Sequence, residues 1–199
     1  MNNRHVRILL VLSAFLAGLV LSLGVIMLVT SPSVTRGVSQ SAAIGGPFRL
    51  TDQEGRTVTE QDLKGHASLV FFGFTHCPDV CPTTLFDISE VMRALGPDAD
   101  RLRAVFVTVD PERDTQPVLK DYLSSFDPHL TGLTGDPAAI ATVAKEYRVY
   151  YKKVPLDDGS YTMDHTAIVY LMDKSGQFVS PFSLKRAPEA SAADLRAYL

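Results

Sequence analysis

A continuous apolar stretch, "ASLVFFGF" at residues 67–74, most strongly restricts the fold of this 199-residue chain. An unbroken, β-prone apolar run is suited to a strand that is covered on both faces, whereas a half-exposed strand alternates polar and apolar residues. A second such run, "LRAVFVTVD", occupies residues 102–110. The sequence therefore predicts a buried sheet flanked by helices, in a chain long enough to form its core without disulfide bonds.

The order of the other predicted elements indicates which kind of α/β fold the chain adopts. Apolar spacing and breaker residues predict helices at 82–95, 116–126, 136–147 and 188–199. They also predict a short hairpin around Glu54–Gly55, a strand at 148–155, and a hairpin formed by 166–173 and 176–183. This order is that of a thioredoxin-like α/β sandwich, in which the redox-active loop follows the first central strand and opens a helix.

The N-terminus predicts a separate transmembrane anchor helix. No charged residue occurs from Ile8 to Val29, a length that crosses a hydrocarbon core of about 30 Å. Arg4 and Arg7 precede this stretch, so the positive-inside rule places residues 1–7 in the cytoplasm. A cleaved signal peptide is the alternative, but its apolar region is usually only about 7–15 residues long. We expect an anchor at 8–29, a flexible tether at 30–46, and a folded domain at 47–199.

This topology predicts where the folded domain resides. A single-pass anchor in the bacterial inner membrane would leave the domain in the periplasm, where dithiols are oxidised unless they are protected. The net charge of −3 gives no electrostatic footprint for nucleic acid, and no glycine-rich nucleotide loop occurs in the sequence.

Both cysteines of the chain lie in "GFTHCPDVCPTTL", residues 73–85. A proline follows each of them and biases Cys77 and Cys81 toward extended backbone. We expect Pro82 to be the first helical residue and Cys81 its cap, with the helix dipole favouring a thiolate at Cys81. The two sulfur atoms would then converge on a single point, which is either a disulfide or a metal ion. A purely structural disulfide across such a short loop would stabilise the fold little.

One histidine is a candidate third ligand. His165 directly precedes the predicted strand 166–173, in the loop that faces the cysteine loop of a thioredoxin-like fold, and Asp164 beside it is placed to orient the ring. An isolated histidine beside a strand is as often simply hydrogen bonded, so the spacing alone leaves both interpretations open. The other histidines fit surface positions or point away from the sulfurs: His5, His66, His76 and His129.

Three motifs together resemble one family. "FFGFTHCPDVCPTTL", "VTVDPERDT" at 107–115 and "DHTAIVYLMD" at 164–173 are similar to the Sco/SenC family, whose members are membrane-anchored, copper-binding, thioredoxin-like proteins that assist cytochrome c oxidase assembly. The resemblance covers residues 47–199. It implies a copper site formed by Cys77, Cys81 and His165, with Asp79 shaping the loop. The segment "DTQPVLKDYL" departs from the family, which usually has proline directly after the threonine.

The chemistry of these residues is consistent with copper. Two thiolates suit Cu(I), and an added imidazole gives a set compatible with Cu(I) or Cu(II). Zinc is the competing metal, although copper binds more tightly by the Irving–Williams order. At the end of the strand 102–110, Asp110 and Arg113 are candidates for capping or ordering the site loop. For Glu112, Arg113 and Asp114 we favour the simpler interpretation of an acidic turn that starts a helix.

Three functions follow from this assignment. The first is a metallochaperone that receives copper from a periplasmic donor and passes it to subunit II of cytochrome c oxidase. The second is a thiol–disulfide reductase, in which Cys77 and Cys81 form a redox dithiol that keeps the oxidase cysteines reduced. The third, a peroxidase, is disfavoured because "LVFFGFTHC" lacks the proline that usually precedes a peroxidatic cysteine.

Overall fold

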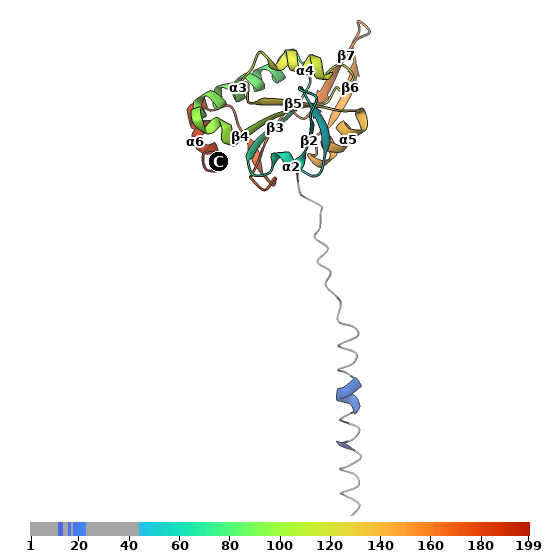
Figure 1. Ribbon diagram of the computed structural model, residues 1–199. Coiled ribbons are helices and arrows are strands. Elements are labelled where there is room, and N and C mark those ends of the chain that lie inside the picture. The colour runs from blue at the N-terminus through green and yellow to red at the C-terminus, as the bar shows by residue number, and fades with distance from the viewer. Residues whose placement is uncertain (1–11, 14–15, 17, 23–43) are drawn as a thin grey trace, which may run out of the picture. The chain divides into compact units, whose positions relative to one another are not determined.

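The computed structural model describes residues 12–13, 16, 18–22 and 44–199 (Figure 1). The chain divides into two units, Met1–Ser41 and Ala42–Leu199. Most of the predicted anchor and tether lies outside the described residues, although residues 18–22 are helical. Among the residues that are described, no helix combines the length and apolarity required of a membrane span.

The second unit is built on a seven-stranded sheet with the order β2-β1-β5-β4-β3-β8-β9. Its strands are β1 (Arg49–Asp52), β2 (Thr57–Thr59), β3 (Ala67–Gly73), β4 (Leu102–Thr108), β5 (Leu130–Thr134), β8 (Val169–Met172) and β9 (Phe178–Phe182). The three central strands β3, β4 and β5 run parallel, whereas the outer strands pair in antiparallel fashion. The predicted hairpins at both ends of the domain are confirmed.

Helices cover both faces of this sheet (Figure 1). The crossovers from β3 to β4 and from β4 to β5 advance in the same direction, so their common right-handedness puts α3 (Val80–Leu95) and α4 (Gln116–Leu123) on one face. Helix α6 (Pro188–Leu195) packs beside α3. Helix α5 (Pro137–Glu146) lies on the opposite face, where Tyr147 just after it contacts Phe72 of β3. Two short helices, α2 (Glu60–Leu63) and η1 (Gly96–Arg101), complete the domain.

Strand β3 lies at the centre of the core. All seven of its residues are buried, and it pairs with β4 on one side and with β8 on the other. Phe71 packs on Phe106 of β4 beneath α3 and α4, whereas Phe72 packs on Tyr170 of β8. The prediction of a strand that is covered on both faces is confirmed.

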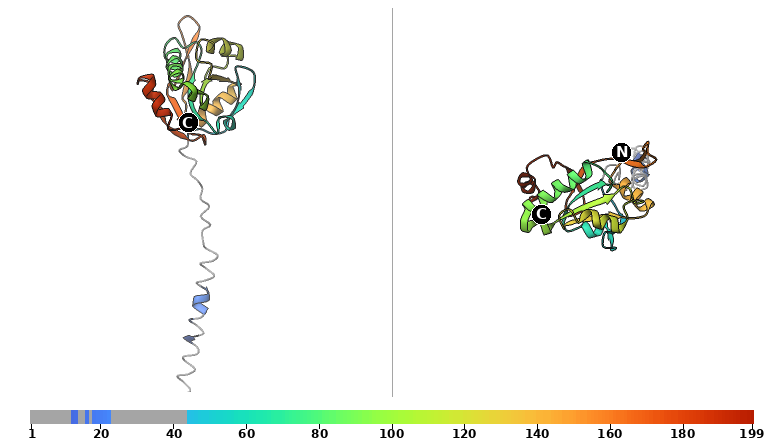
Figure 2. Two further views of the ribbon diagram at one scale, coloured as in Figure 1. Left: turned by 60° about the vertical axis from the view of Figure 1, so that its left-hand side comes forward. Right: turned by 90° about the horizontal axis from the view of Figure 1, so that it is seen from above.

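A two-stranded sheet stands apart from the main sheet. Strands β6 (Tyr151–Pro155) and β7 (Tyr161–His165) form an antiparallel hairpin that projects from the domain (Figure 1, Figure 2). The predicted strand at 148–155 corresponds to β6, whereas no strand was predicted for residues 157–164. Strand β7 was missed because "YTMDH" is short and its only buried residue is Met163, too little for an alternating pattern to be recognised. His165 is therefore the last residue of a strand.

Truncation of the central strand should strongly destabilise the domain. Leu69 in β3 is fully buried, at 0% exposure, so we expect Leu69→Ala to lower the free energy of unfolding by about 2–5 kcal/mol through lost burial and a residual cavity. Leu156→Ala is the matched control because Leu156 is 46% exposed. Urea denaturation of both variants checks this. Equal losses of stability would contradict the placement of β3 at the centre of the core.

Candidate metal centre

The cysteine loop leaves the sheet at the carboxyl end of β3, where Gly73 makes room for a sulfur atom. A Cβ at this position would lie 2.8 Å from Sγ of Cys81 and 2.7 Å from the ring of Phe106. Both distances are shorter than real carbon contacts allow. The glycine therefore lets the side chain of Cys81 pack directly against the end of the central strand.

Helix α3 begins earlier than the sequence predicted. Its first residue is Val80 and its N-cap is Asp79, so Cys81 lies inside the first turn and is not the cap. Pro82 is tolerated there because N–H groups in the first turn of a helix have no intrahelical acceptor. Asp79 is exposed, and its side chain makes no capping hydrogen bond.

Burial, rather than the helix dipole, governs the chemistry of Cys81. Its side chain is 0% exposed, and burial raises the pKa of its thiol well above the ordinary value. The backbone hydrogen bond from Phe74 lowers this pKa in part, while Cys77 and Asp114 raise it further. The prediction that the helix terminus favours a thiolate at Cys81 is therefore wrong for the metal-free protein.

Cys77 receives the hydrogen bond that the helix terminus offers. It is half-buried, and the backbone N–H of Cys81 donates to its Sγ atom at 3.4 Å. The backbone N–H of Cys77 in turn donates to the carbonyl oxygen of Phe74 at 3.2 Å, which closes the loop. The two cysteines thus differ in their environments: one sulfur is reachable from solvent, and the other is buried.

His165 closes the site from the opposite side. Its Nε2 atom lies 3.6 Å from Sγ of Cys81, and its Nδ1 atom lies 3.1 Å from the carbonyl oxygen of Thr166. A carbonyl can only accept, so Nδ1 carries the proton and Nε2 directs its lone pair toward the sulfur. The Phe74 ring packs edge-on against the His165 ring, with the two ring centroids 5.7 Å apart and an interplanar angle of 90°. Asp164, predicted to orient the ring, is exposed, and the Thr166 carbonyl makes the orienting hydrogen bond instead.

The same environment keeps the imidazole neutral. Burial lowers the pKa of His165 below 6.5, and this effect outweighs the Thr166 hydrogen bond and the charge of Asp164, which raise it. A neutral imidazole coordinates a metal without first losing a proton.

The three side chains form a set that fits a metal ion. The two sulfur atoms and one ring nitrogen of Cys77, Cys81 and His165 all lie within 4.8 Å of one another. Three ligands at about 2.3 Å from a common ion lie about 4 Å apart in a trigonal arrangement, so a contraction of less than about 1 Å brings all three into coordination. Soft sulfur donors with one imidazole suit copper or zinc and exclude magnesium and calcium, which take oxygen ligands.

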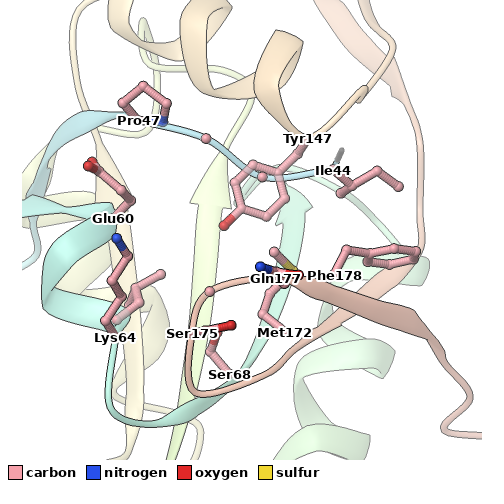
Figure 3. A pocket seen from close by; sticks show the side chains of 14 residues that line it. Ile44, Pro47, Glu60, Lys64, Ser68, Tyr147, Met172, Ser175, Gln177 and Phe178 are labelled. Carbon is pink, nitrogen blue, oxygen red and sulfur yellow. The ribbon is translucent and has the colours of Figure 1, made fainter. Parts of the chain in front are cut away.

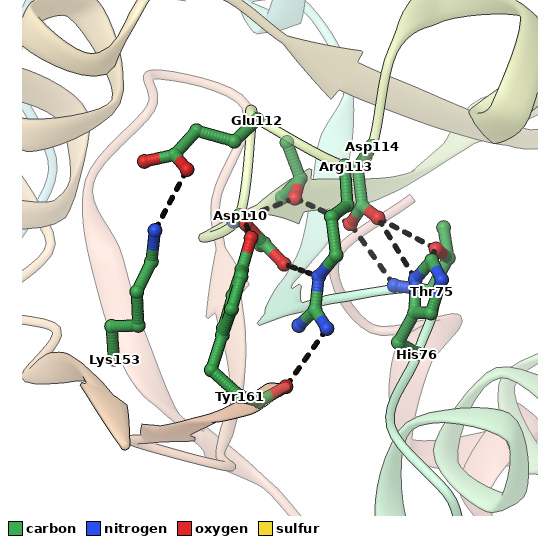
Figure 4. A network of polar contacts seen from close by, with 9 residues as sticks. Thr75, His76, Asp110, Glu112, Arg113, Asp114, Lys153 and Tyr161 are labelled. Carbon is green, nitrogen blue, oxygen red and sulfur yellow. Dashed lines mark hydrogen bonds and ion pairs between the residues drawn. The ribbon is translucent and has the colours of Figure 1, made fainter. Parts of the chain in front are cut away.

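A buried carboxylate in the turn after β4 holds the cysteine loop through hydrogen bonds. Asp114 is fully buried and accepts hydrogen bonds from the backbone N–H of Thr75 at 3.0 Å, from the Thr75 hydroxyl at 2.6 Å, and from the Thr108 hydroxyl at 2.6 Å (Figure 4). The sequence pattern favoured a helix-starting turn for Asp114, and this role was not predicted. Its position just beyond a buried strand, at the same sheet edge as the cysteines, was the signal that pointed to it.

The other described histidines lie away from the sulfur atoms. His76 is exposed, with Nδ1 3.0 Å from the Thr75 hydroxyl. His66 contacts Arg103, and His129 contacts Asp127 and Asp100. His5 lies outside the described residues.

One cavity lies apart from this site (Figure 3). It has a volume of about 590 Å³ and lies beside Ser68, at the opposite end of β3 from the cysteine loop. Glu60, Lys64 and Tyr147 line it. None of the three candidate ligands lines this cavity.

We expect His165 to titrate below pH 6.5 and His129 above pH 6.5. The pKa of His165 is lowered by burial, whereas the hydrogen bond to Asp127 raises the pKa of His129. As the pH falls below 6.5, His165 becomes protonated in the unfolded chain before it does in the folded protein. The free energy of unfolding therefore decreases as the pH falls from 6.5 toward the lower pKa of the folded state. NMR titration of the metal-free, reduced protein checks both shifts. A His165 midpoint above that of His129 would contradict the buried environment.

The chain was compared with known proteins. The SCO1/SenC family profile matches residues 36–199. An SCO2-like protein of Rickettsia prowazekii is 43% identical over 143 residues, which cover 71% of this chain and 70% of the relative. The solved structure of Bradyrhizobium japonicum ScoI with copper bound is 68% identical in sequence, with a TM-score of 0.78. This match covers 79% of the present chain and 100% of the ScoI chain.

A more distant structure supports the fold alone. BsSco, described as a member of the Sco family of cytochrome c oxidase assembly proteins with a disulfide switch, is 23% identical with a TM-score of 0.62. That match covers 79% of this chain and 94% of the other. The thioredoxin-like α/β fold is thereby supported, and the match to the family profile extends over the whole folded domain. The chain belongs to the SCO1/SenC family.

Proposed function

We propose that this protein binds copper through Cys77, Cys81 and His165 and delivers it to cytochrome c oxidase during assembly of that enzyme. The observation that carries the proposal is the convergence of two sulfur atoms and one neutral ring nitrogen within 4.8 Å. Thiolates suit Cu(I), and the imidazole extends the set to Cu(II). The copper-bound structure of the Bradyrhizobium relative supports copper over zinc as the metal.

The arrangement of the ligands suits a protein that gives its metal away. Cys77 and His165 are half-buried, whereas Cys81 is fully buried and forms the interior side of the site. Three protein ligands leave a coordination position that a ligand of the recipient protein can occupy. The buried Cys81 thiol has a raised pKa and must release its proton on metal binding, so we expect binding to weaken as the pH falls.

The recipient and the location are part of the proposal. BsSco is described as belonging to a family of cytochrome c oxidase assembly proteins, and this chain shares that family. We infer that subunit II of the oxidase is the recipient and that a periplasmic protein supplies the copper. The uncharged stretch from Ile8 to Val29 is the basis for proposing an inner-membrane anchor with the domain in the periplasm.

A thiol–disulfide reductase is the second candidate. The backbone N–H of Cys81 already donates to Sγ of Cys77, so the two sulfur atoms lie close to each other at the helix start. In that function Cys77 and Cys81 act as attacking and resolving thiols, and a periplasmic thiol reductant would regenerate them. The two functions share the cysteines but differ in their need for His165.

Substitution of His165 separates the two candidates. We expect His165→Ala to weaken Cu(II) binding by at least about tenfold. Substitution of a residue that only hydrogen bonds to a metal ligand already lowers metal affinity about 10–100-fold, and His165 is a proposed ligand itself. The Cys77–Cys81 pair should still form a reducible disulfide, since exchange needs only the two sulfur atoms. His129→Ala is the matched control because the His129 ring contacts the carboxylates of Asp127 and Asp100 and is not one of the three candidate ligands. Competition titration with Cu(II) and thiol counting after reduction measure the two properties.

Cells that carry only the His165→Ala protein provide the functional measurement. We expect little oxidase activity at limiting copper, and recovery when copper is added in excess. Full oxidase activity at limiting copper would contradict the three-ligand chaperone and favour the reductase. Loss of disulfide exchange together with copper binding would instead indicate that the substitution had disturbed the cysteine loop.

A further inference from the structure

The strand that carries His165 is not part of the main sheet. Strands β6 and β7 pair only with each other, so within the described part of the chain no strand pairing joins them to the seven-stranded sheet. The cysteine loop, in contrast, continues directly from the central strand β3. His165 is joined to β8 of the main sheet by residues 166–168, so its distance from the sulfur atoms depends on this short connection and on the contacts between the hairpin and the body of the domain.

Arg113 contacts the hairpin at Tyr161, the first residue of β7. Its Nη1 atom donates to the Tyr161 carbonyl oxygen at 2.8 Å, and its guanidinium carbon lies 3.8 Å from the centroid of the Tyr161 ring (Figure 4). The Nε atom of Arg113 is paired with the carboxylate of Asp110. The Tyr161 hydroxyl donates to the same carboxylate at 3.0 Å, so the three side chains form a closed set.

The same guanidinium group also reaches the ring that supports the histidine. Its carbon lies 5.8 Å from the centroid of Phe74, whose ring meets the His165 ring edge-on. Phe74 directly follows β3 and accepts the backbone hydrogen bond of Cys77. Arg113 thus contacts Tyr161, at the turn end of the hairpin, and lies near Phe74, the residue that packs on His165 at the other end of β7.

Burial distinguishes this contact from another ion pair between the same two segments. The Arg113 side chain is 22% exposed and that of Asp110 only 2%. Lys153 of β6 and Glu112 also form a pair, at 2.7 Å, but their side chains are 42% and 60% exposed. Exposed pairs contribute little, whereas a planar guanidinium that stacks on a ring and donates in two directions fixes a geometry that lysine cannot reproduce.

We propose that Arg113 is a positioning residue that holds the His165 hairpin at its working distance from Cys77 and Cys81. The neighbouring Asp114 fastens the cysteine loop through Thr75. One turn after β4, residues 110–114, therefore holds both halves of the site. This replaces the interpretation of Arg113 and Asp114 as part of a simple helix-starting turn. The consequence for copper rests on the proposed function, but the structural role does not.

Arg113→Met in the full-length protein tests this role, with Lys153→Met as the matched control. Both substitutions remove a cation that joins the hairpin to residues 110–114 and that lies over the Tyr161 ring, but only the first removes the buried guanidinium and its hydrogen bond to the Tyr161 carbonyl oxygen. Arg113→Lys is the third variant; it keeps a charge opposite Asp110 and so protects the fold, while it loses the planar stack and the second hydrogen bond. Amide hydrogen exchange of the metal-free protein is measured first, over residues 161–165 and over β3 as an internal reference.

We expect exchange over residues 161–165 to rise at least about tenfold in Arg113→Lys and Arg113→Met, with β3 unchanged, and to stay at the wild-type rate in Lys153→Met. Cu(II) affinity should fall about 10–100-fold in both Arg113 variants, as for other outer partners of a metal ligand. The Cys77–Cys81 disulfide should remain reducible in every variant.

Wild-type exchange over residues 161–165 in Arg113→Lys, or an equal rise in Lys153→Met, would overturn the proposal. If Arg113→Met does not fold, the exchange rate of Arg113→Lys decides the question. If the wild-type protein binds no Cu(II), the proposed function fails, and the exchange measurement still decides whether Arg113 positions the hairpin.

Discussion

Burial of β3 on both faces is the constraint on which the rest of the structure depends. Because this strand is enclosed, its carboxyl end delivers the chain into a crowded interior, and Gly73 leaves just enough room there for a sulfur atom. Cys81 consequently lies in the first turn of α3 as a buried core residue, while Cys77 stays within reach of solvent. The difference between the two sulfurs follows directly from how the strand is packed.

The helix terminus and burial act in opposite directions on the ionisation of the Cys81 thiol, and burial prevails. The start of a helix favours a thiolate, typically by about 0.3–1 kcal/mol at an exposed site. Removing a charge from water costs several kcal/mol, so burial dominates and the metal-free thiol keeps its proton. His165 responds to burial in the opposite sense and stays neutral. Metal binding then has to release a thiol proton but no imidazole proton.

The sequence was sufficient for the features that repeat over many residues. The apolar runs predicted β3 and β4, and helical spacing predicted α3 to within two residues of its start. The pairing of Cys77 and Cys81 with His165 required a fold to bring them together, and the predicted order of strands and helices supplied one. The family motifs pointed to the same three residues.

The remaining details depend on tertiary contacts that leave no periodic signal. Strand β7 is too short for alternation to reveal it, and the carbonyl of Thr166, which orients the His165 ring, is a backbone group available at any residue. Arg113 and Asp114 resemble any charged turn until the structure shows one stacked on Tyr161 and the other buried under Thr75. Such contacts are specific to single pairs of residues, so composition and spacing do not encode them.

X-ray absorption at the copper edge of the Cu(II)-loaded, full-length protein tests the central claim most directly. The account predicts a first shell with two sulfur atoms and the scattering pattern of one imidazole, from Cys77, Cys81 and His165. A shell that contains only nitrogen and oxygen atoms would contradict it, as would one with sulfur but no imidazole.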